Sequence, residues 1–184
     1  MNNDALRIGL GKHRRPANVG PVDRGLLSTS LLREYGNVYL KNNTVATVVS
    51  VAGDRYVIAG ESDVSEILYN FVHDQDTNGL TYTGDENIVL ADMSFSLRSG
   101  NNQKIGIYLA VNRGGDIDPD ADRISESEIY LITTGSTEQD IPQTGFVHAL
   151  IHLKKGDTVY GIVQNTTSTA NIIVEFANLI VNKI

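Results

Sequence analysis

The sequence predicts an all-β protein, a jelly-roll β-sandwich, on three observations. Short segments rich in β-branched residues follow one another along the chain, separated by glycine, asparagine or aspartate. In several segments apolar and polar side chains alternate strictly, which is typical of a strand with one buried and one solvated face. Cysteine is absent and no apolar run approaches the roughly 20 residues of a membrane-spanning helix, so we expect a soluble fold held by core packing.

We expect residues 1–43 to form an extended N-terminal arm and residues 44–184 to form the jelly-roll body. Glycine and proline recur through positions 1–25 without any hydrophobic period, which indicates an extended segment. A short helix is expected over residues 28–36, where a serine can cap its start and Gly36 can end it.

The net charge of -7 conceals an asymmetry between these two parts. Residues 1–41 carry seven Lys or Arg and three Asp or Glu, a net charge of +4, whereas the remaining residues carry eight and nineteen, a net charge of -11. A basic arm on an acidic body indicates that the arm binds a partner of its own, the alternative being a solvated N-terminus that merely carries charge. The residues expected to contact this partner are Arg7, Lys12, Arg14, Arg15, Arg24, Leu31, Leu32 and Tyr35.

Within the body, Gly53 and Asp54 indicate a hairpin turn between the first two strands, and Gly156 is expected to supply the turn conformation of a second hairpin, residues 152–167. Residues 61–71 depart from the β pattern, because their apolar residues fall at helical spacing and predict a short helix. The strands expected, in chain order, are 44–51, 55–59, 91–98, 105–111, 127–133, 146–153, 157–164 and 170–184.

The last of these strands is unusual because both of its faces are apolar. Val174 and Ile180 fall on one face, and Ile173 and Leu179 on the other. A sandwich strand with one solvated face should not show this pattern. Either a second layer of the same chain covers the additional face or a neighbouring subunit does, and we favour the subunit.

The acidic loop "GGDIDPDADR" is the first candidate for a metal site. Asp116, Asp118 and Asp120 fall at every second position, as in the start of a calcium-binding EF-hand loop. Ala121 stands where that loop needs glycine, and Ser127 where it needs glutamate. A solvated acidic loop is therefore favoured, with these three aspartates kept as the calcium alternative.

His148 and His152 lie four residues apart, a zinc spacing that suits a helix. On a strand they share a face with Phe146 and Leu150 but stand about 13 Å apart, too far to bind one metal ion. The chain shows no nucleophile with a partner and no phosphate-binding loop, so we expect no enzymatic activity, no catalytic residue and no cofactor. The basic stretch "GLGKHRRP" is expected to meet an acidic protein surface rather than nucleic acid, because the body is acidic.

Residues 79–184 resemble the jelly roll of the tumour necrosis factor and complement globular-head superfamily, in the short form found in bacteriophage structural proteins. The resemblance rests on "GLTYTG" (79–84), "ADMSFSLRSGNNQ" (91–103), "IYLAVNRGG" (107–115) and above all on residues 153–184, with their Leu-x-x-Gly-Asp-x-Val turn and long closing strand. The sequence departs from the family at Arg113, where a small turn residue is usual, and in the acidic insertion at 114–126.

The resemblance implies a homotrimer packed about a threefold axis, with Tyr160, Ile173, Phe176, Leu179 and Val181 at the subunit interface. It also implies a virion structural protein assembled in the host cytoplasm, most simply a capsid decoration or cement protein whose arm grips the major capsid protein or another virion protein, with no nucleic acid or membrane partner. The alternative is a receptor- or glycan-binding knob of a tail or head fibre. A cellular ligand of the tumour necrosis factor type would require secretion, and the N-terminal stretch "MNNDALRIGLGKHRRP" lacks the apolar region of a signal peptide.

Overall fold

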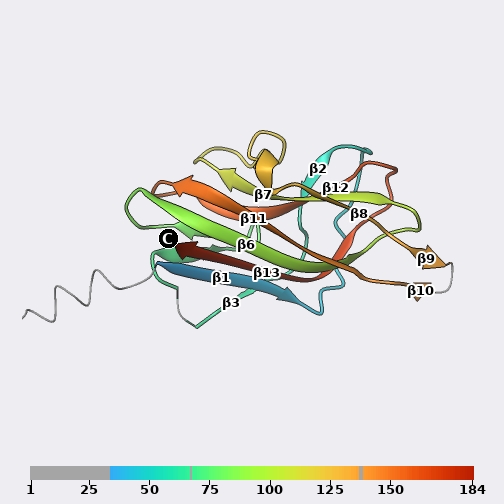
Figure 1. The fold of residues 1–184 in the computed structure, drawn as a ribbon, viewed down its shortest axis with the longest axis horizontal. Helices are drawn as coiled ribbons and strands as arrows, with labels where there is room; N and C mark the ends of the chain where they lie inside the picture. Colours follow the sequence, from blue (N-terminus) through green and yellow to red (C-terminus); the bar gives the residue numbers. More distant parts are fainter. Residues whose placement is uncertain (1–33, 67, 137–138) are drawn as a thin grey trace, which may run out of the picture. The chain divides into compact units, whose positions relative to one another are not determined.

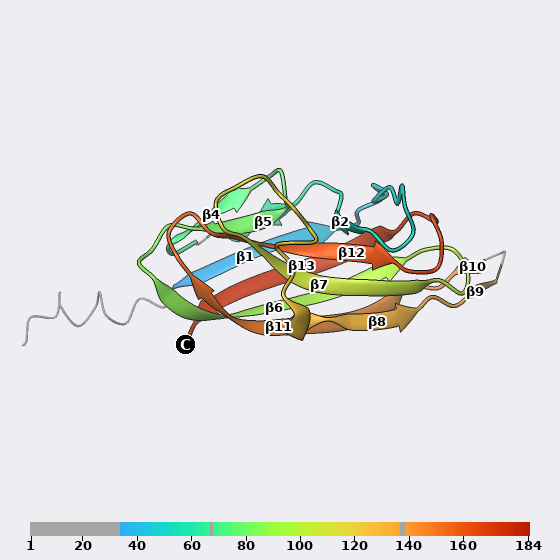
Figure 2. The same ribbon diagram turned by 90° about the horizontal axis from the view of Figure 1, so that it is seen from above.

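The computed structural model describes residues 34–66, 68–136 and 139–184, and shows two antiparallel sheets packed face to face (Figure 1). The five-stranded sheet contains, in spatial order, β11 (Gln143–Leu153), β6 (Asn87–Arg98), β13 (Ile173–Lys183), β1 (Tyr35–Lys41) and β3 (Asp63–Val64). The six-stranded sheet contains β4 (Phe71–Asp74), β5 (Gly79–Tyr82), β12 (Thr158–Asn165), β7 (Lys104–Asn112) and β8 (Ile129–Ile132), with β2 (Arg55–Val57) paired to β12 (Figure 2). A helical turn, η1 (Ser125–Ser127), and a small ribbon of β9 (Gly135–Ser136) and β10 (Gln139–Asp140) complete the described elements.

The core lies between the two sheets and follows the alternation in the sequence. Strand β6 directs every second side chain into the core over most of its length, and β7 does so from Ile105 to Val111. The alternation predicted for residues 91–98 and 105–111 is confirmed. The buried residues of these two strands are Val89, Ala91, Met93, Phe95, Leu97, Ile105, Ile107, Leu109 and Val111.

The stretch 152–167 is a crossing between the sheets rather than a hairpin. Strand β11 pairs with β6 in the five-stranded sheet, whereas β12 pairs with β7, β5 and β2 in the other. Gly156 has a φ of +95°, so the prediction that it supplies a left-handed turn conformation is confirmed. The two strands diverge after this turn because each has a better partner in its own sheet.

Arg113 fixes this crossing. Its guanidinium forms an ion pair with Asp157 and donates a hydrogen bond of 2.6 Å to the carbonyl of His152. The Asp157 carboxylate also accepts the backbone N–H of Lys154 at 2.8 Å. The departure from the family pattern at Arg113 therefore has a structural cause, since this side chain ties the end of β7 to the turn between β11 and β12.

Strand β13 contains a β-bulge, so the residues on each of its two faces differ from those that we predicted. The register with β6 shifts between Val174 and Phe176, which makes Glu175 the extra residue. A single inserted residue exchanges the faces of all residues beyond it. The core-facing set is consequently Ile172 and Val174 before the bulge, and Ala177, Leu179 and Val181 after it.

Two other expectations about local structure were wrong. The described part of residues 61–71 forms no helix. Val64 of β3 pairs with Val38 of β1, and Phe71 begins β4 with its ring buried. Segments 44–51 and 55–59 do not pair with each other, because Thr47 bridges to Ile172 and β2 pairs with β12. In each case pairing with a distant strand overrides the local pattern.

Tyr35 also lies elsewhere than expected. It begins β1 and pairs with Asn182 of β13, so residues 35–41 belong to the five-stranded sheet rather than to the arm. The helix predicted over 28–36 falls almost wholly outside the described residues, as do the remaining residues expected to contact a partner, namely Arg7, Lys12, Arg14, Arg15, Arg24, Leu31 and Leu32.

Candidate subunit interface

The middle of the outer face of the six-stranded sheet, over β7 and β12, is covered by the chain itself. Tyr108 and Tyr160 point outward from β7 and β12, and both are completely buried in a second small cluster with Val57 of β2. The Tyr160 hydroxyl donates to Asp122 at 2.7 Å. Burial, followed by this hydrogen bond, raises the pKa of Tyr160 well above its usual value. The acidic insertion thus packs against this face.

The outer face of the five-stranded sheet is different, because its exposed large apolar side chains in the described part of the chain lie on three neighbouring strands, β11, β6 and β13. On the six-stranded sheet the exposed ones, Val72, Tyr130 and Ile132, lie on β4 and β8 at opposite edges. Leu150 and Phe146 of β11 are 67% and 54% exposed, Ile88 of β6 is 52% exposed, and Phe176 of β13 is 41% exposed. Exposed large apolar side chains grouped on one face indicate a site of association.

The strand register places these side chains in rows across the sheet. Directly opposed side chains on one face of antiparallel strands have Cβ atoms about 5 Å apart, so each row is a set of neighbours. In the order β1, β13, β6, β11, the three central rows are Tyr39–Asn178–Ser94–Phe146, Asn37–Ile180–Asp92–His148 and Tyr35–Asn182–Leu90–Leu150.

Charged pairs lie at the two ends of this face. Arg98 contacts Glu175 at 3.1 Å at the end near Phe176. At the opposite end Nε2 of His152 lies 2.9 Å and Nζ of Lys154 lies 3.8 Å from Glu86. Charged pairs at the rim of a surface with exposed apolar side chains are usual in a protein–protein interface.

A depression adjoins the face at the Phe176 end. It encloses about 550 Å³. A side chain of a second molecule could enter it beside the Phe176 ring. The lining residues are Lys41, Asn42, Asn43, Thr44, Ser96, Glu175 and Phe176.

Comparison with solved structures identifies the architecture, although no protein-family model and no curated protein sequence matches the chain. The chain resembles Eiger TNF from S. frugiperda with a TM-score of 0.55 and 15% sequence identity, covering 82% of this chain and 93% of that one. The fold is a tumour necrosis factor-like jelly roll. Murine APRIL, solved at pH 5.0, is also similar, with a TM-score of 0.49, 11% identity and coverage of 82% of this chain and 99% of that one. The predicted fold class, an all-β jelly roll, is confirmed.

In this jelly roll the five residues predicted at the subunit interface do not share one surface. Phe176 is exposed on the outer face of the five-stranded sheet, and Ile173 is half-buried on the same face. Leu179 and Val181 lie in the core of a single chain, and Tyr160 lies beneath the covering of the six-stranded sheet. The prediction is wrong for these three side chains, because a side chain buried within one subunit cannot contact another.

The sequence offered a signal for the interface residues that this prediction missed. Phe146 and Leu150 share the outer face of β11 with His148 and His152, as expected from their spacing, while the alternate positions of β11 are buried. Residues 146–153 therefore form a strand with apolar side chains on both its core face and its outer face, and this pattern was the signal.

The aspartates of the acidic loop are engaged in local structure. Asp118 accepts the backbone N–H groups of Asp120 and Ala121, and Asp120 forms an ion pair with Arg55. Within the described ranges no group of three or more His, Cys, Asp or Glu side chains is arranged to hold a metal ion, and Asp116, Asp118 and Asp120 form no such group. These contacts stiffen the loop that covers the six-stranded sheet.

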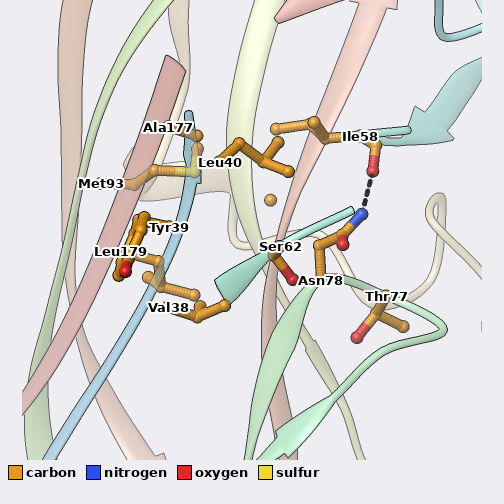
Figure 3. Close-up of a pocket in the computed structure, with 11 residues that line it drawn as sticks. Val38, Tyr39, Leu40, Ile58, Ser62, Thr77, Asn78, Met93, Ala177 and Leu179 are labelled. Atoms are coloured by element: carbon orange, nitrogen blue, oxygen red, sulfur yellow. Dashed lines mark hydrogen bonds between the residues drawn. The ribbon is translucent and has the colours of Figure 1, made fainter. Parts of the chain in front are cut away.

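Two smaller hollows lie along the side of the sandwich where β3 and β4 meet. One, between the sheets, has a volume of about 20 Å³, room for one water molecule, and Asn78 closes it by donating to the carbonyl of Ile58 at 2.8 Å (Figure 3). The other is polar, encloses about 380 Å³ and contains Ser62 and His73, whose Oγ and Nε2 atoms lie 2.7 Å apart. This Ser–His contact joins the edges of the two sheets, which gives it a structural role.

No helix in the described part of the chain could cross a membrane, since its one helical turn spans only Ser125–Ser127.

Proposed function

We propose that the chain is the subunit of a homotrimeric, non-enzymatic structural protein that associates through the outer face of its five-stranded sheet. The observation that carries this proposal is the exposure of Phe146, Leu150, Ile88 and Phe176 on three neighbouring strands of one face, whereas the chain itself covers the middle of the opposite outer face. A closed trimer would bury this apolar surface. Obligate interfaces commonly bury about 2,000 Å² or more. The tumour necrosis factor-like fold supports the same assembly.

The trimer is tested by the mass of the native species. Analytical ultracentrifugation at micromolar concentration should give three times the 20.0 kDa of one chain. The double variant Phe146→Ser, Leu150→Ser should sediment as a folded monomer, because both side chains are exposed in the subunit and contribute little to its core. Val72→Ser, an exposed apolar residue of the other sheet, is the matched control and should remain trimeric. A monomeric wild-type chain would contradict the proposal.

We further propose that this trimer decorates a virus particle, as a capsid decoration or cement protein located in the virion. Support comes from the charge asymmetry, with +4 on residues 1–41 and -11 on the rest. A basic segment that orders on a partner can cover a large surface at the cost of its own entropy. The arm would then bind an acidic surface of the major capsid protein while the jelly roll forms the trimer.

Binding to particles tests this second step. The full-length Arg14→Glu, Arg15→Glu variant should bind emptied particles of the encoding virus at least about tenfold more weakly than the wild type, with a reduced dependence on salt. Lys155→Glu, an exposed charge change in the turn after β11, is the matched control. Unchanged binding of the double variant would contradict the role of the arm, and a copy number of a few trimers per particle instead of hundreds would favour a fibre.

A further inference from the structure

We propose that the interface is pH-responsive, with Asp92 and His148 making trimer assembly take up protons, so that the trimer is tighter in mild acid than in mild alkali. This inference rests on the proposed function, because it requires that a second copy cover the outer face of the five-stranded sheet.

Asp92 and His148 occupy the centre of that face. They are directly opposed in the β11–β6 register, and Asp92 is opposed on its other side by Ile180 of β13. The adjacent rows contain Leu90 with Leu150 and Ser94 with Phe146. The Phe146 ring lies 5.2 Å from the His148 ring. Apart from this pair, the centre of the face on β6 and β11 is apolar or neutral.

The other titratable groups on this face lie away from the pair. Strand β1 contributes Asn37 to the same row, and Tyr35, Tyr39 and Lys41 to other rows. Strand β3 places Asp63 opposite Tyr39, on the far side of β1 from the pair. Beyond the central rows, charged side chains of β6, β11 and β13 form ion pairs at the ends of the face: Arg98 with Glu175, and His152 and Lys154 with Glu86. His148 is therefore the group placed to balance the charge of Asp92.

Assembly changes the energetics of this pair by removing water from it. A carboxylate buried without a compensating charge is strongly unfavourable, whereas a carboxylate beside an imidazolium forms a pair with no net charge. Histidine ordinarily changes its charge between about pH 5 and 8. Covering the face should therefore favour the protonated form of His148, and each subunit should bind up to one proton as the trimer forms.

The sign of the pH dependence follows from this proton uptake. Assembly that binds protons is favoured as pH falls through the histidine range and is lost as pH rises through it. One fully coupled proton changes the association constant up to about tenfold per pH unit, so three protons change the trimer association constant up to about 1,000-fold per pH unit.

Sedimentation of dilute full-length protein at pH 5.5 and pH 8.0, at constant ionic strength, tests the inference. The wild type should dissociate at pH 8.0 at concentrations where it is trimeric at pH 5.5. Asp92→Asn should lose the preference for pH 5.5, because no carboxylate then needs a counter-charge. His148→Gln should assemble weakly at both, and the double variant Asp92→Asn, His148→Gln should behave like Asp92→Asn.

The pH dependence and the trimer can fail independently, so their tests are distinguishable. His152→Gln, which removes the histidine at the end of the face, should keep the wild-type pH dependence. A wild-type trimer of equal affinity at both pH values overturns the inference and leaves the trimer standing. A pH dependence that persists in Asp92→Asn assigns the effect to the general charge of the acidic body and also overturns it. A monomer at every pH overturns both.

Discussion

At the scale of single residues, three buried tyrosines hold elements together through their hydroxyl groups. Tyr82 donates to the carboxylate of Glu34 at 2.6 Å, and Tyr160 donates to Asp122 at 2.7 Å. The Tyr108 hydroxyl lies 2.7 Å from Oε1 of Gln164 and 2.9 Å from that of Glu128. Burial first, and these polar partners second, raise the pKa of all three tyrosines.

These raised pKa values predict how the fold responds to alkali. Because the folded state keeps its phenolic protons, their contribution to stability is complete below the unfolded tyrosine pKa of about 10 and decreases as pH rises above it. Absorbance at 295 nm should show at most five of the eight tyrosines ionising while the protein remains folded. The remaining three should ionise only with loss of the circular dichroism signal. Tyr160→Phe should reduce the late phase by one tyrosine, and eight tyrosines titrating in the folded protein would contradict the assignment.

At the scale of elements, the bulge at Glu175 decides which residues of β13 stabilise the subunit and which remain at its surface. Leu179 is 3% exposed and lies in the core, whereas Phe176, which comes shortly before it in the same strand, is exposed on the outer face. Without the extra residue, the regular alternation would place residues 176 and 180 on the same face as Val174.

This division predicts that two substitutions in one strand lower the free energy of unfolding by different amounts. Leu179→Ala should lower the free energy of unfolding by about 2–5 kcal/mol, through lost apolar burial and the cavity left behind. Phe176→Ser should lower it by less, about 1 kcal/mol, because the side chain is 41% exposed in the subunit and its removal leaves no enclosed cavity. Urea unfolding in the dissociated Phe146→Ser, Leu150→Ser background would measure both without a contribution from assembly. Equal losses for the two variants would show that the bulge does not set the faces as described.

The same element explains what the sequence could and could not predict. Alternation predicted β6 and β7 well, because their strands are regular and half of their side chains enter one core. It failed in β13, where a bulge has no local signature, and it failed at Tyr160, where the distant acidic insertion around Asp122 covers the outer face. The helix expected over 61–71 failed because Val64 pairs with Val38 of β1, a partner far outside the local window that shows helical spacing.

At the scale of the whole body, the two outer faces of the sandwich differ in how much of their apolar surface the chain itself covers. The acidic insertion and β2 cover the middle of the six-stranded sheet, so that Tyr108 and Tyr160 are buried within one subunit. The five-stranded sheet has no comparable covering among the described residues, and its exposed apolar side chains are available to a second copy. The sequence could predict that a surface of this kind exists, from the excess of apolar positions in strands 146–153 and 170–184. Its location depended on knowing which sheet each strand joins.

The pairing of β1 with β13 has a consequence for biosynthesis. Tyr35 is hydrogen-bonded into a sheet opposite Asn182, and β13 lies between β6 and β1. While a ribosome is still translating the intervening residues, β6 and β1 lack the strand that joins them, and their unpaired edges are open to other nascent chains. Productive folding therefore has to wait until residues 173–183 have emerged, and such long-range closure is slow. A cell making many copies at once would gain from chaperones that shield the waiting strands during this interval.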